Sequence, residues 1–404
     1  MQAIQRADSI AALRELAKRR IPRPIFDFID GGADEEITLA RNLSDFRRVE
    51  LAPRVLRDVA ARDSSVPILG RNAGLPLIIA PTGLAALGWP RADVLLARAA
   101  GRRGLPFVIS TSSSVRLEEI AMGAKDTRLW FQVYVYKDRD LVRSLVERAK
   151  ACAVEALVVT ADTPVLGWRR RDHRNGFTVP LRLTPALAAE VARCWRWTWD
   201  IVRFGSPKMQ NFVEAGQAND IVSLAQLMTR NMDASVSWRE VSWLRDLWNG
   251  PLIVKGVSCV EDAEEAARRG VDAVWISNHG GRQLDGAPST ISVLPAIAQA
   301  LSGRAEIYLD GGVRSGADIV KARALGANAA AVGRATLYGV SAGGQLGADK
   351  ALSILSEEFD RCLALMGLPS PRELTASCVR TPSSWGGDLG PATAPQRSAE
   401  AAEG

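Results

Sequence analysis

His279, one of two histidines in this chain of 404 residues, lies in the stretch ISNHGGRQLDG, directly after an apolar run. The two glycines that follow it let the backbone turn sharply and come close to a ligand. Arg282, three residues further on, can pair with a carboxylate through two parallel hydrogen bonds. A lone histidine is more often structural, but an imidazole beside a guanidinium favours a general base next to a carboxylate clamp.

Asp162 and Lys255 lie at the ends of two other apolar runs, ALVVTADTP and LIVKGV. A buried carboxylate can orient a histidine and stabilise its protonated form, although Asp162 alone would equally well cap the segment that follows it. A lysine at the end of a buried strand serves an anion, a Schiff base or an electron-rich cofactor. A Schiff-base lyase or isomerase of a sugar phosphate is therefore a competing class of enzyme.

Glycine-rich stretches end two later apolar runs, LDGGVR at residues 309–314 and VGR at residues 332–334. Their backbone N–H groups and arginines suit a phosphate, and together they predict a phosphorylated substrate or cofactor. A nicotinamide on a Rossmann domain is not expected, because no GxGxxG opens a βαβ unit. With only His173 and His279 in the chain, we expect no metal site.

Eight short apolar runs position these residues, and each is followed by a segment with apolar residues at every third or fourth position. The runs are LPLIIAPTG, PFVISTSS, LWFQVYVY, ALVVTADTP, LIVKGV, AVWISNHGG, EIYLDGGV and AAAVGRA. Continuous apolar runs are typical of parallel strands buried on both faces. The eight units predict an α/β fold, a (β/α)8 TIM barrel rather than an open doubly wound sheet, with the polar strand ends meeting at one mouth.

Three segments fall outside this repeat. We predict an N-terminal helical extension at 1–70, a barrel at 71–380 and a disordered tail at 381–404, which is rich in Ser, Gly, Pro, Ala and Glu. An insertion at 165–236, after the fourth strand, contains CWRWTWDIVRFGSPK. Its tryptophans and arginines suit either a lid over the site or contact with a membrane surface through residues 190–210.

The composition is that of a soluble globular protein, with 47% hydrophobic residues and a formal net charge of +6. This charge accompanies no nucleic-acid-binding motif, so we expect no nucleic-acid partner. The five cysteines show neither zinc spacing nor a disulfide framework, which fits the cytoplasm. The N-terminus predicts an amphipathic helix rather than a signal peptide.

The stretch SNHGGRQ at 277–283 resembles the active-site motif of the FMN-dependent (S)-2-hydroxy acid dehydrogenases and oxidases, the family of glycolate oxidase, flavin L-lactate dehydrogenases and mandelate dehydrogenase. Supporting stretches extend to about residue 375: IDGGADEE, APTG, FQVYVYKDRD, TADTPVLGWRRRD, IVKGV, DGGVRSGADIVKARALG and VGRATLYG. The pieces MDASVSWREVSWLRDLW, LWFQVYV and GRATLYG resemble the mandelate dehydrogenase branch most. The resemblance implies FMN as cofactor and oxidation of a 2-hydroxy acid to a 2-keto acid.

The resemblance also implies roles for residues at the strand ends. His279 would be the base, oriented by Asp162, and Arg282 would pair with the substrate carboxylate. Arg169 and Tyr134 would also bind the substrate. Lys255 would stabilise the charge of the reduced flavin. The cofactor-binding residues would be Pro81, Thr82, Gly83, Ser110, Gln132, Thr160, Lys255, Ser277, Asp310, Gly311, Gly312, Arg314, Gly333 and Arg334.

Phe28 departs from the family's pattern. The chain reads Phe26-Asp27-Phe28 where the family has Tyr-Asp-Tyr, and the hydroxyl of the second tyrosine reaches the substrate carboxylate. Loss of that donor predicts weaker binding of simple 2-hydroxy acids, or a carboxylate that is masked or differently placed. It also keeps open a flavin-binding homologue with an atypical substrate, or with no turnover at all.

Gly83 bears on the electron acceptor, because the resemblance suggests alanine there in oxidases and glycine in dehydrogenases. We therefore expect a dehydrogenase that passes electrons to a quinone or a carrier protein, with an oxidase that uses O2 as the alternative. We also expect a homotetramer in the cytoplasm, peripheral on the inner face of the membrane.

Overall fold

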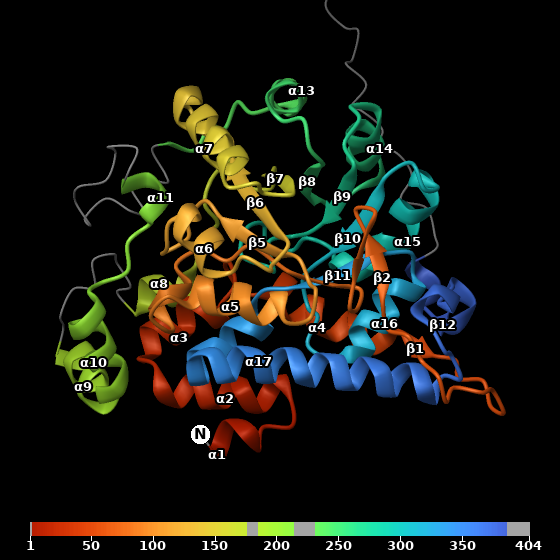
Figure 1. Cartoon of the computed structure of the whole chain (residues 1–404), viewed down its shortest axis with the longest axis horizontal. Coiled ribbons are helices and arrows are strands. Elements are labelled where there is room, and N and C mark those ends of the chain that lie inside the picture. Colours follow the sequence, from red (N-terminus) through yellow and green to blue (C-terminus); the bar gives the residue numbers. More distant parts are fainter. Residues whose placement is uncertain (1, 176–184, 214–230, 386–404) are drawn as a thin grey trace, which may run out of the picture.

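The computed structural model describes residues 2–175, 185–213 and 231–385. Within them, eight parallel strands close into a barrel, with β11 paired to β4, and Figure 1 shows them surrounded by helices. Each predicted apolar run contains one strand, so the predicted (β/α)8 barrel is confirmed. The strands are β4 (Leu77–Ile79), β5 (Phe107–Ser110), β6 (Leu129–Tyr134), β7 (Ala156–Thr160), β8 (Leu252–Val257), β9 (Ala273–Ile276), β10 (Glu306–Leu309) and β11 (Ala329–Val332).

Large side chains fill the interior of the barrel. The indole of Trp130 and the ring of Trp275 both pack against Tyr308, with ring centroids 5.6 and 5.9 Å apart, and all three are fully buried. The hairpin of β2 (Val66–Ile68) and β3 (Arg71–Ala73) packs its apolar residues onto the same cluster. Because Arg128, just before β6, donates to the carbonyl oxygen of Ile68 at 2.7 Å, this hairpin covers the amino ends of the strands. The opposite mouth is left for a site.

Helices of the repeat turn their apolar face to the strands. In α7 (Arg139–Ala151), Asp138 caps the first turn and the buried side chains recur at three- and four-residue intervals. The others are α5 (Ala92–Gly101), α6 (Leu117–Gly123), α13 (Trp238–Leu247), α14 (Val260–Arg268), α15 (Thr290–Leu301), α16 (Gly316–Ala324) and α17 (Arg334–Leu365). The long α17 bends at Gly344, whose φ of 58° suits glycine, with Trp89 packed against it.

The N-terminal residues form α1 (Gln2–Gln5), α2 (Ile10–Arg20), α3 (Arg23–Asp30) and α4 (Ile37–Arg48). Helix α2 packs along α17, as Figure 1 shows. Strand β1 (Glu50–Leu51) pairs with β12 (Val379–Arg380). Within the predicted tail, η5 (Ser383–Trp385) is a short 3-10 helix beside Arg48, and residues 386–404 lie outside the described residues.

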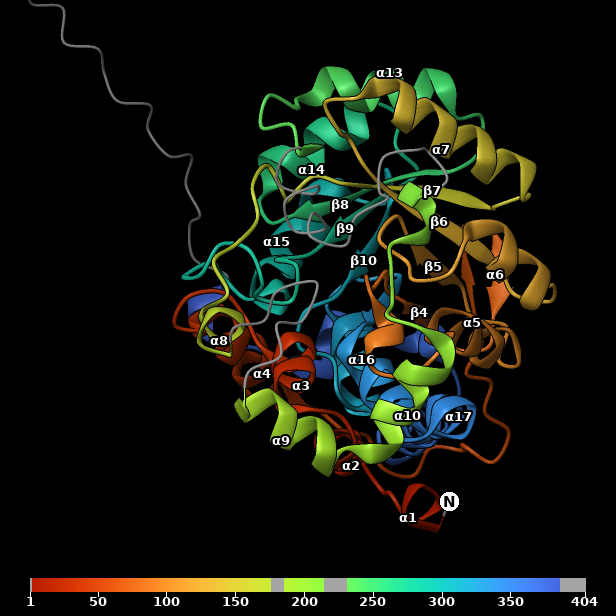
Figure 2. The ribbon, with the colours of Figure 1, turned by 90° about the vertical axis from the view of Figure 1, so that its left-hand side faces the viewer.

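The insertion after β7 forms α8 (Arg170–Arg174), α9 (Pro185–Arg193), α10 (Trp195–Phe204) and α11 (Gln210–Val213). Figure 2 shows α9 and α10 beside the end of α2. Trp197 of α10 donates through Nε1 to the carbonyl oxygen of Leu87 at 2.7 Å, and Arg20 of α2 pairs with Asp200. Residues 176–184 and 214–230 of the insertion lie outside the described residues. Among the described helices, none is long and apolar enough to span a membrane.

Candidate active site

A cavity of about 630 Å³ opens at the carboxyl ends of the barrel strands. It brings most of the predicted site residues together, although they come from all eight strand ends and from α3. Those that line it are Phe28, Pro81, Thr82, Gly83, Ser110, Gln132, Tyr134, Thr160, Arg169, Lys255, His279, Arg282, Asp310, Gly311, Gly312, Arg314, Gly333 and Arg334. Asp162 and Ser277 do not line the cavity themselves. They lie behind its wall and contact residues that do.

His279 and Asp162 form a hydrogen-bonded pair. Nδ1 of the imidazole lies 2.9 Å from Oδ1 of Asp162, so Nε2 is the nitrogen left for a ligand in the cavity. Gly256 leaves the space that Asp162 occupies, because a Cβ on residue 256 would lie 2.6 Å from Cβ of Asp162. Its φ of 111° also favours glycine. Burial alone would raise the pKa of Asp162, but the charges of His279 and Lys255 outweigh burial and lower that pKa to about 2. The carboxylate therefore stays ionised.

Lys255 is buried, and its ammonium is held by Ser277 and two carboxylates. Nζ donates to Oγ of Ser277 at 2.7 Å and lies 3.3 Å from Oδ2 of Asp310 and 4.0 Å from Oδ2 of Asp162. Oγ of Ser277 in turn donates to Asp310 at 2.7 Å. Burial lowers the pKa of Lys255, but the two carboxylates outweigh it and leave the pKa raised. A Schiff base needs a neutral amine, so this environment argues against the lyase alternative.

Arg282 and Arg334 join the barrel to the carboxyl end of α3. Nη1 of Arg282 donates to the carbonyl oxygens of Phe28 at 2.7 Å and Gly31 at 2.9 Å. Arg334 donates to the carbonyl oxygens of Ile29, Gly280 and Gly31. Burial lowers the pKa of Arg334 to about 10 and that of Arg282 well below its usual value. Buried guanidiniums in this arrangement favour an anionic ligand, although three N–H groups of Arg334 already donate to backbone carbonyl oxygens.

The ring of Phe28 lies against the guanidiniums of Arg282 and Arg169. The guanidinium carbon of Arg282 is 5.1 Å from the ring centroid, and that of Arg169 is 5.8 Å away. Burial raises the pKa of Tyr134, which therefore keeps its proton and can donate to a ligand. Phe28 thus keeps the aromatic ring that the family's tyrosine would place beside these cations, and lacks its hydroxyl.

The residues present fit a flavin with a phosphate. Oε1 of Gln132 accepts from Oγ of Ser110 and from the N–H of Thr111, each at 3.2 Å. Its buried Nε2 has no hydrogen-bond partner among the described residues, so it can donate to a ring carbonyl of a ligand. Gly311 and Gly312 have φ values of 88° and 107°, and a Cβ on Gly312 would lie 2.1 Å from the carbonyl oxygen of Asn42. Their backbone beside Arg314 suits a phosphate.

Several lining residues were not predicted as site residues. Asp172 lies by Arg169 and Arg282, and burial raises its pKa. The imidazole of His173 stacks on Trp168 with centroids 3.7 Å apart. Asp172 and His173 sit in the run WRRRDHR together with Arg169, so for these two residues proximity in sequence was an unused signal. Met209 is a different case, because it returns to the cavity from the far part of the insertion.

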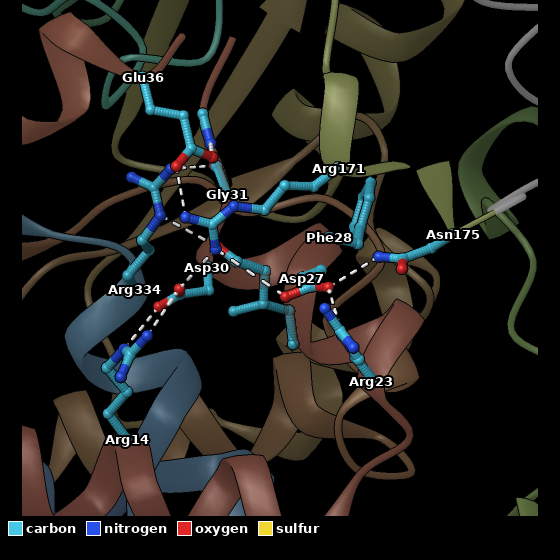
Figure 3. A network of polar contacts seen from close by, with 12 residues as sticks. Arg14, Arg23, Asp27, Phe28, Asp30, Gly31, Glu36, Arg171, Asn175 and Arg334 are labelled. Atoms are coloured by element: carbon cyan, nitrogen blue, oxygen red, sulfur yellow. Dashed lines mark hydrogen bonds and ion pairs between the residues drawn. The ribbon is translucent and has the colours of Figure 1, made fainter. Parts of the chain in front are cut away.

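An ion-pair network fixes α3 and α8 beside the cavity. Arg171 contacts Asp30 at 3.1 Å, Asp27 at 3.8 Å and Glu36, as Figure 3 shows. Arg14 pairs with both carboxylate oxygens of Asp30, at 2.7 and 2.8 Å. Burial alone would raise the pKa of Asp30, but its hydrogen bonds from Arg14 and Tyr338 lower it to about 2.

The fold and the site define an FMN-dependent oxidoreductase, and comparison with known proteins identifies the family. The chain belongs to the FMN-dependent dehydrogenase family, whose model matches residues 17–381. This confirms the predicted family and its cofactor.

Two curated relatives are dehydrogenases, and the similar solved structures include both (S)-mandelate dehydrogenase and mandelate oxidase. The chain is 41% identical over 362 residues to (S)-mandelate dehydrogenase of Pseudomonas putida, covering 90% of this chain and 91% of that one. It is also 41% identical over 362 residues to L-lactate dehydrogenase of Caulobacter vibrioides, covering 89% and 94%. The crystal structure of the monotopic membrane protein (S)-mandelate dehydrogenase superposes with a TM-score of 0.90 at 39% identity, covering 94% of this chain and 100% of that one. Mandelate and lactate are both 2-hydroxy acids, so the predicted FMN-dependent 2-hydroxy acid dehydrogenase is confirmed at this level.

Proposed function

We propose that His279 is the base in the oxidation of a 2-hydroxy acid to a 2-keto acid. The observation that carries this proposal is the pair with Asp162 at 2.9 Å, which leaves Nε2 for the substrate. Asp162 is ionised and stabilises the imidazolium that forms when the proton is taken. The geometry serves removal of the hydroxyl proton and removal of the α-proton alike.

The substrate carboxylate binds at Arg282 and Arg169, with Tyr134 as a neutral donor beside them. Both guanidiniums lie in the cavity wall, and the acid near them is Asp172. Arg334 adds a further cation to the same wall, so the three guanidiniums outnumber the single carboxylate of Asp172. This excess of positive charge supports an anionic substrate.

FMN, when bound, accepts the two electrons that leave the α-carbon. Lys255 and Gln132 lie where they can hold ring carbonyl groups, and Gly311, Gly312 and Arg314 suit the phosphate. The charge of Lys255 is maintained by Asp310, so it is present before electrons arrive. The remaining predicted cofactor residues line the same cavity or, like Ser277, support those that do.

An anaerobic bleaching screen tests the function. Purified protein should be yellow and should bleach on addition of one or more members of a panel of aliphatic and aryl 2-hydroxy acids. His279→Asn should remain yellow and bleach far more slowly. A yellow wild-type protein that no panel member bleaches would overturn the proposed activity and leave a flavin-binding protein without turnover.

A second function is contact with a membrane surface through α10. Trp195, Trp199 and Val202 recur at four and three residues and are 64%, 62% and 72% exposed, whereas Trp197 on the other face is buried. Arg196 and Arg203 flank them and suit anionic headgroups. The solved relative (S)-mandelate dehydrogenase is a monotopic membrane protein, and this supports the proposal.

We infer a position on the inner face of the cytoplasmic membrane, with a quinone or a carrier protein as electron acceptor and O2 as the alternative. Gly83 supports a dehydrogenase only through the family resemblance; within the cavity wall, a Cβ at this position would lie 2.9 Å from Cβ of Ser112, which gives the glycine a steric reason as well. The homotetramer and the boundaries at residues 70 and 380 stay predictions.

A further inference from the structure

The insertion after β7 returns to the barrel and completes the cavity. Residues 207–213 run over the carboxyl end of β5, and Met209 among them lines the cavity. Its side chain is 4% exposed, although the segment belongs to a surface insertion. The first part of the same insertion supplies Leu166 and Trp168 to this cavity. Two separate parts of one insertion therefore contribute to its apolar wall.

Asn211 holds this returning segment on the barrel. Its amide oxygen accepts from the N–H of Leu117 at 3.0 Å and from Nη2 of Arg148 at 3.2 Å. Its Nδ2 donates to the carbonyl oxygens of Ser110 and Thr111, at 3.4 Å each. Asn211 is fully buried, so each of these bonds replaces one that water would otherwise make.

Backbone contacts strengthen the same attachment. The N–H of Gln210 donates to the carbonyl oxygen of Ser113 at 3.1 Å, and Nη1 of Arg148 donates to that of Asn211 at 3.2 Å. Arg148 is itself held by Glu118 through bonds of 2.7 and 2.9 Å. Because Gln210 and Asn211 directly follow Met209, these bonds limit the places that the Met209 side chain can reach.

An aromatic series links the segment to the polar part of the site. Phe212 meets Tyr136 edge-on with centroids 5.3 Å apart, and Tyr136 packs on Tyr134 at 5.9 Å. Tyr134 lines the cavity. The returning segment thus supports one polar wall residue and contributes one apolar wall residue.

We propose that Met209 is a specificity-determining residue that contacts the substituent on the substrate's α-carbon, and that Asn211 is its positioning residue. This rests on the proposed function, in which His279, Arg282 and Arg169 take up the polar groups of the substrate. The substituent must then face the apolar lining, which includes Met209, Leu166 and Trp168. A long, unbranched thioether adapts its shape to an aryl or other bulky apolar group.

Met209→Ala tests the contact, with Met122→Ala as its matched control, because Met122 lies on α6 and is 63% exposed. Steady-state kcat and KM are measured on FMN-loaded protein for mandelate, lactate and glycolate with a dye as acceptor. We expect kcat/KM for mandelate to fall about tenfold relative to lactate in Met209→Ala. In Met122→Ala the ratio should stay at the wild-type value.

Asn211→Ala tests the positioning. This variant should also lower kcat/KM for mandelate relative to lactate, through a change in KM and with kcat for lactate unchanged. Residues 207–213 should become accessible to limited proteolysis. Asn211→Asp keeps an acceptor for Leu117 and Arg148, the partners at the shorter distances, and should restore most of the preference. If Asn211 had a purely structural role, Asn211→Ala would lower kcat/KM for mandelate and lactate alike and leave their ratio unchanged.

The outcomes separate the two proposals. If wild type oxidises 2-hydroxy acids and folded Met209→Ala keeps the wild-type ratio, the specificity inference is wrong and the proposed function stands. If wild type oxidises none, both are wrong. Should Met209→Ala lose FMN, Met209→Leu replaces it and should shift the ratio in the same direction by a smaller factor; no shift in that variant would overturn the inference.

Discussion

Nδ1 of His279 lies 2.9 Å from Oδ1 of Asp162, across 117 positions of sequence, and the shared hydrogen bond orients the imidazole towards the cavity. Lys255 is 4.0 Å from the other oxygen of the same carboxylate. One acid thus serves both the base and the buried cation, and its pKa of about 2 keeps it ionised for both.

Asp162→Asn should remove the charge that stabilises the imidazolium, and its new amide N–H can donate to Nδ1 of His279 and so favour the wrong tautomer. We expect kcat to fall roughly a thousandfold or more, with FMN content retained. Pre-steady-state bleaching measures the effect, and exposed Asp246→Asn on α13 is the control. A loss below tenfold would mean that the pair does not orient the base.

Lys255→Met should slow reduction of the flavin, because it removes a charge poised to stabilise developing negative charge and leaves Asp310 and Asp162 without their cation. We expect a decrease of at least about tenfold in the bleaching rate and a lower flavin reduction potential. Lys150→Met on the surface of α7 is the matched control. Trapping of Lys255 by borohydride with a sugar phosphate would instead revive the lyase alternative.

Phe28→Tyr should restore a donor to the carboxylate site, since the Phe28 ring already lies 5.1 Å from the guanidinium of Arg282. A hydrogen bond to a charged group contributes about 1.5–3 kcal/mol, which predicts a roughly tenfold to hundredfold lower KM with kcat little changed. Kinetics with glycolate, lactate and mandelate decide the matter. Unchanged KM for all three would show that Phe28 costs the enzyme nothing.

Asp30 should make stability depend on pH. Its pKa is about 2 in the folded protein against an ordinary value of 3.8, so its contribution is fully present above about pH 4 and is lost as the pH falls towards 2. We expect about 2 kcal/mol of unfolding free energy to depend on this group. Urea unfolding of wild type and Asp30→Asn should differ by that amount at pH 6 and converge near pH 2. A difference that does not shrink would contradict the assignment.

The Trp195→Ser, Trp199→Ser double variant should weaken binding to vesicles of anionic lipid while activity with a soluble dye is kept. Both indoles are more than half exposed and lie on one face of α10. Leu365→Ser, which removes an exposed apolar side chain elsewhere, is the control. Flotation with vesicles measures the difference, and equal flotation of all three proteins would argue against α10 as the contact.

The amino-acid sequence by itself determined the barrel and the polar residues at its strand ends. Each strand is a short apolar run, and parallel strands carry their carboxyl ends to one mouth, so His279, Lys255 and Asp162 were predictable from local pattern. The motif around His279 was specific enough to indicate the family and FMN. Local order along the chain sufficed for these features because each depends on a few neighbouring residues.

Tertiary structure alone decided what surrounds those residues. The three backbone bonds of Arg334, the position of Phe28 below two guanidiniums and the return of Met209 to the cavity join segments that lie far apart in the chain. No periodicity in the sequence predicts such contacts, because they depend on where long loops and the N-terminal helices pack. Arg282 shows the difference well: its residue type was readable as an anion partner, but its bonds to Phe28 and Gly31 exist only once α3 packs over the mouth of the barrel.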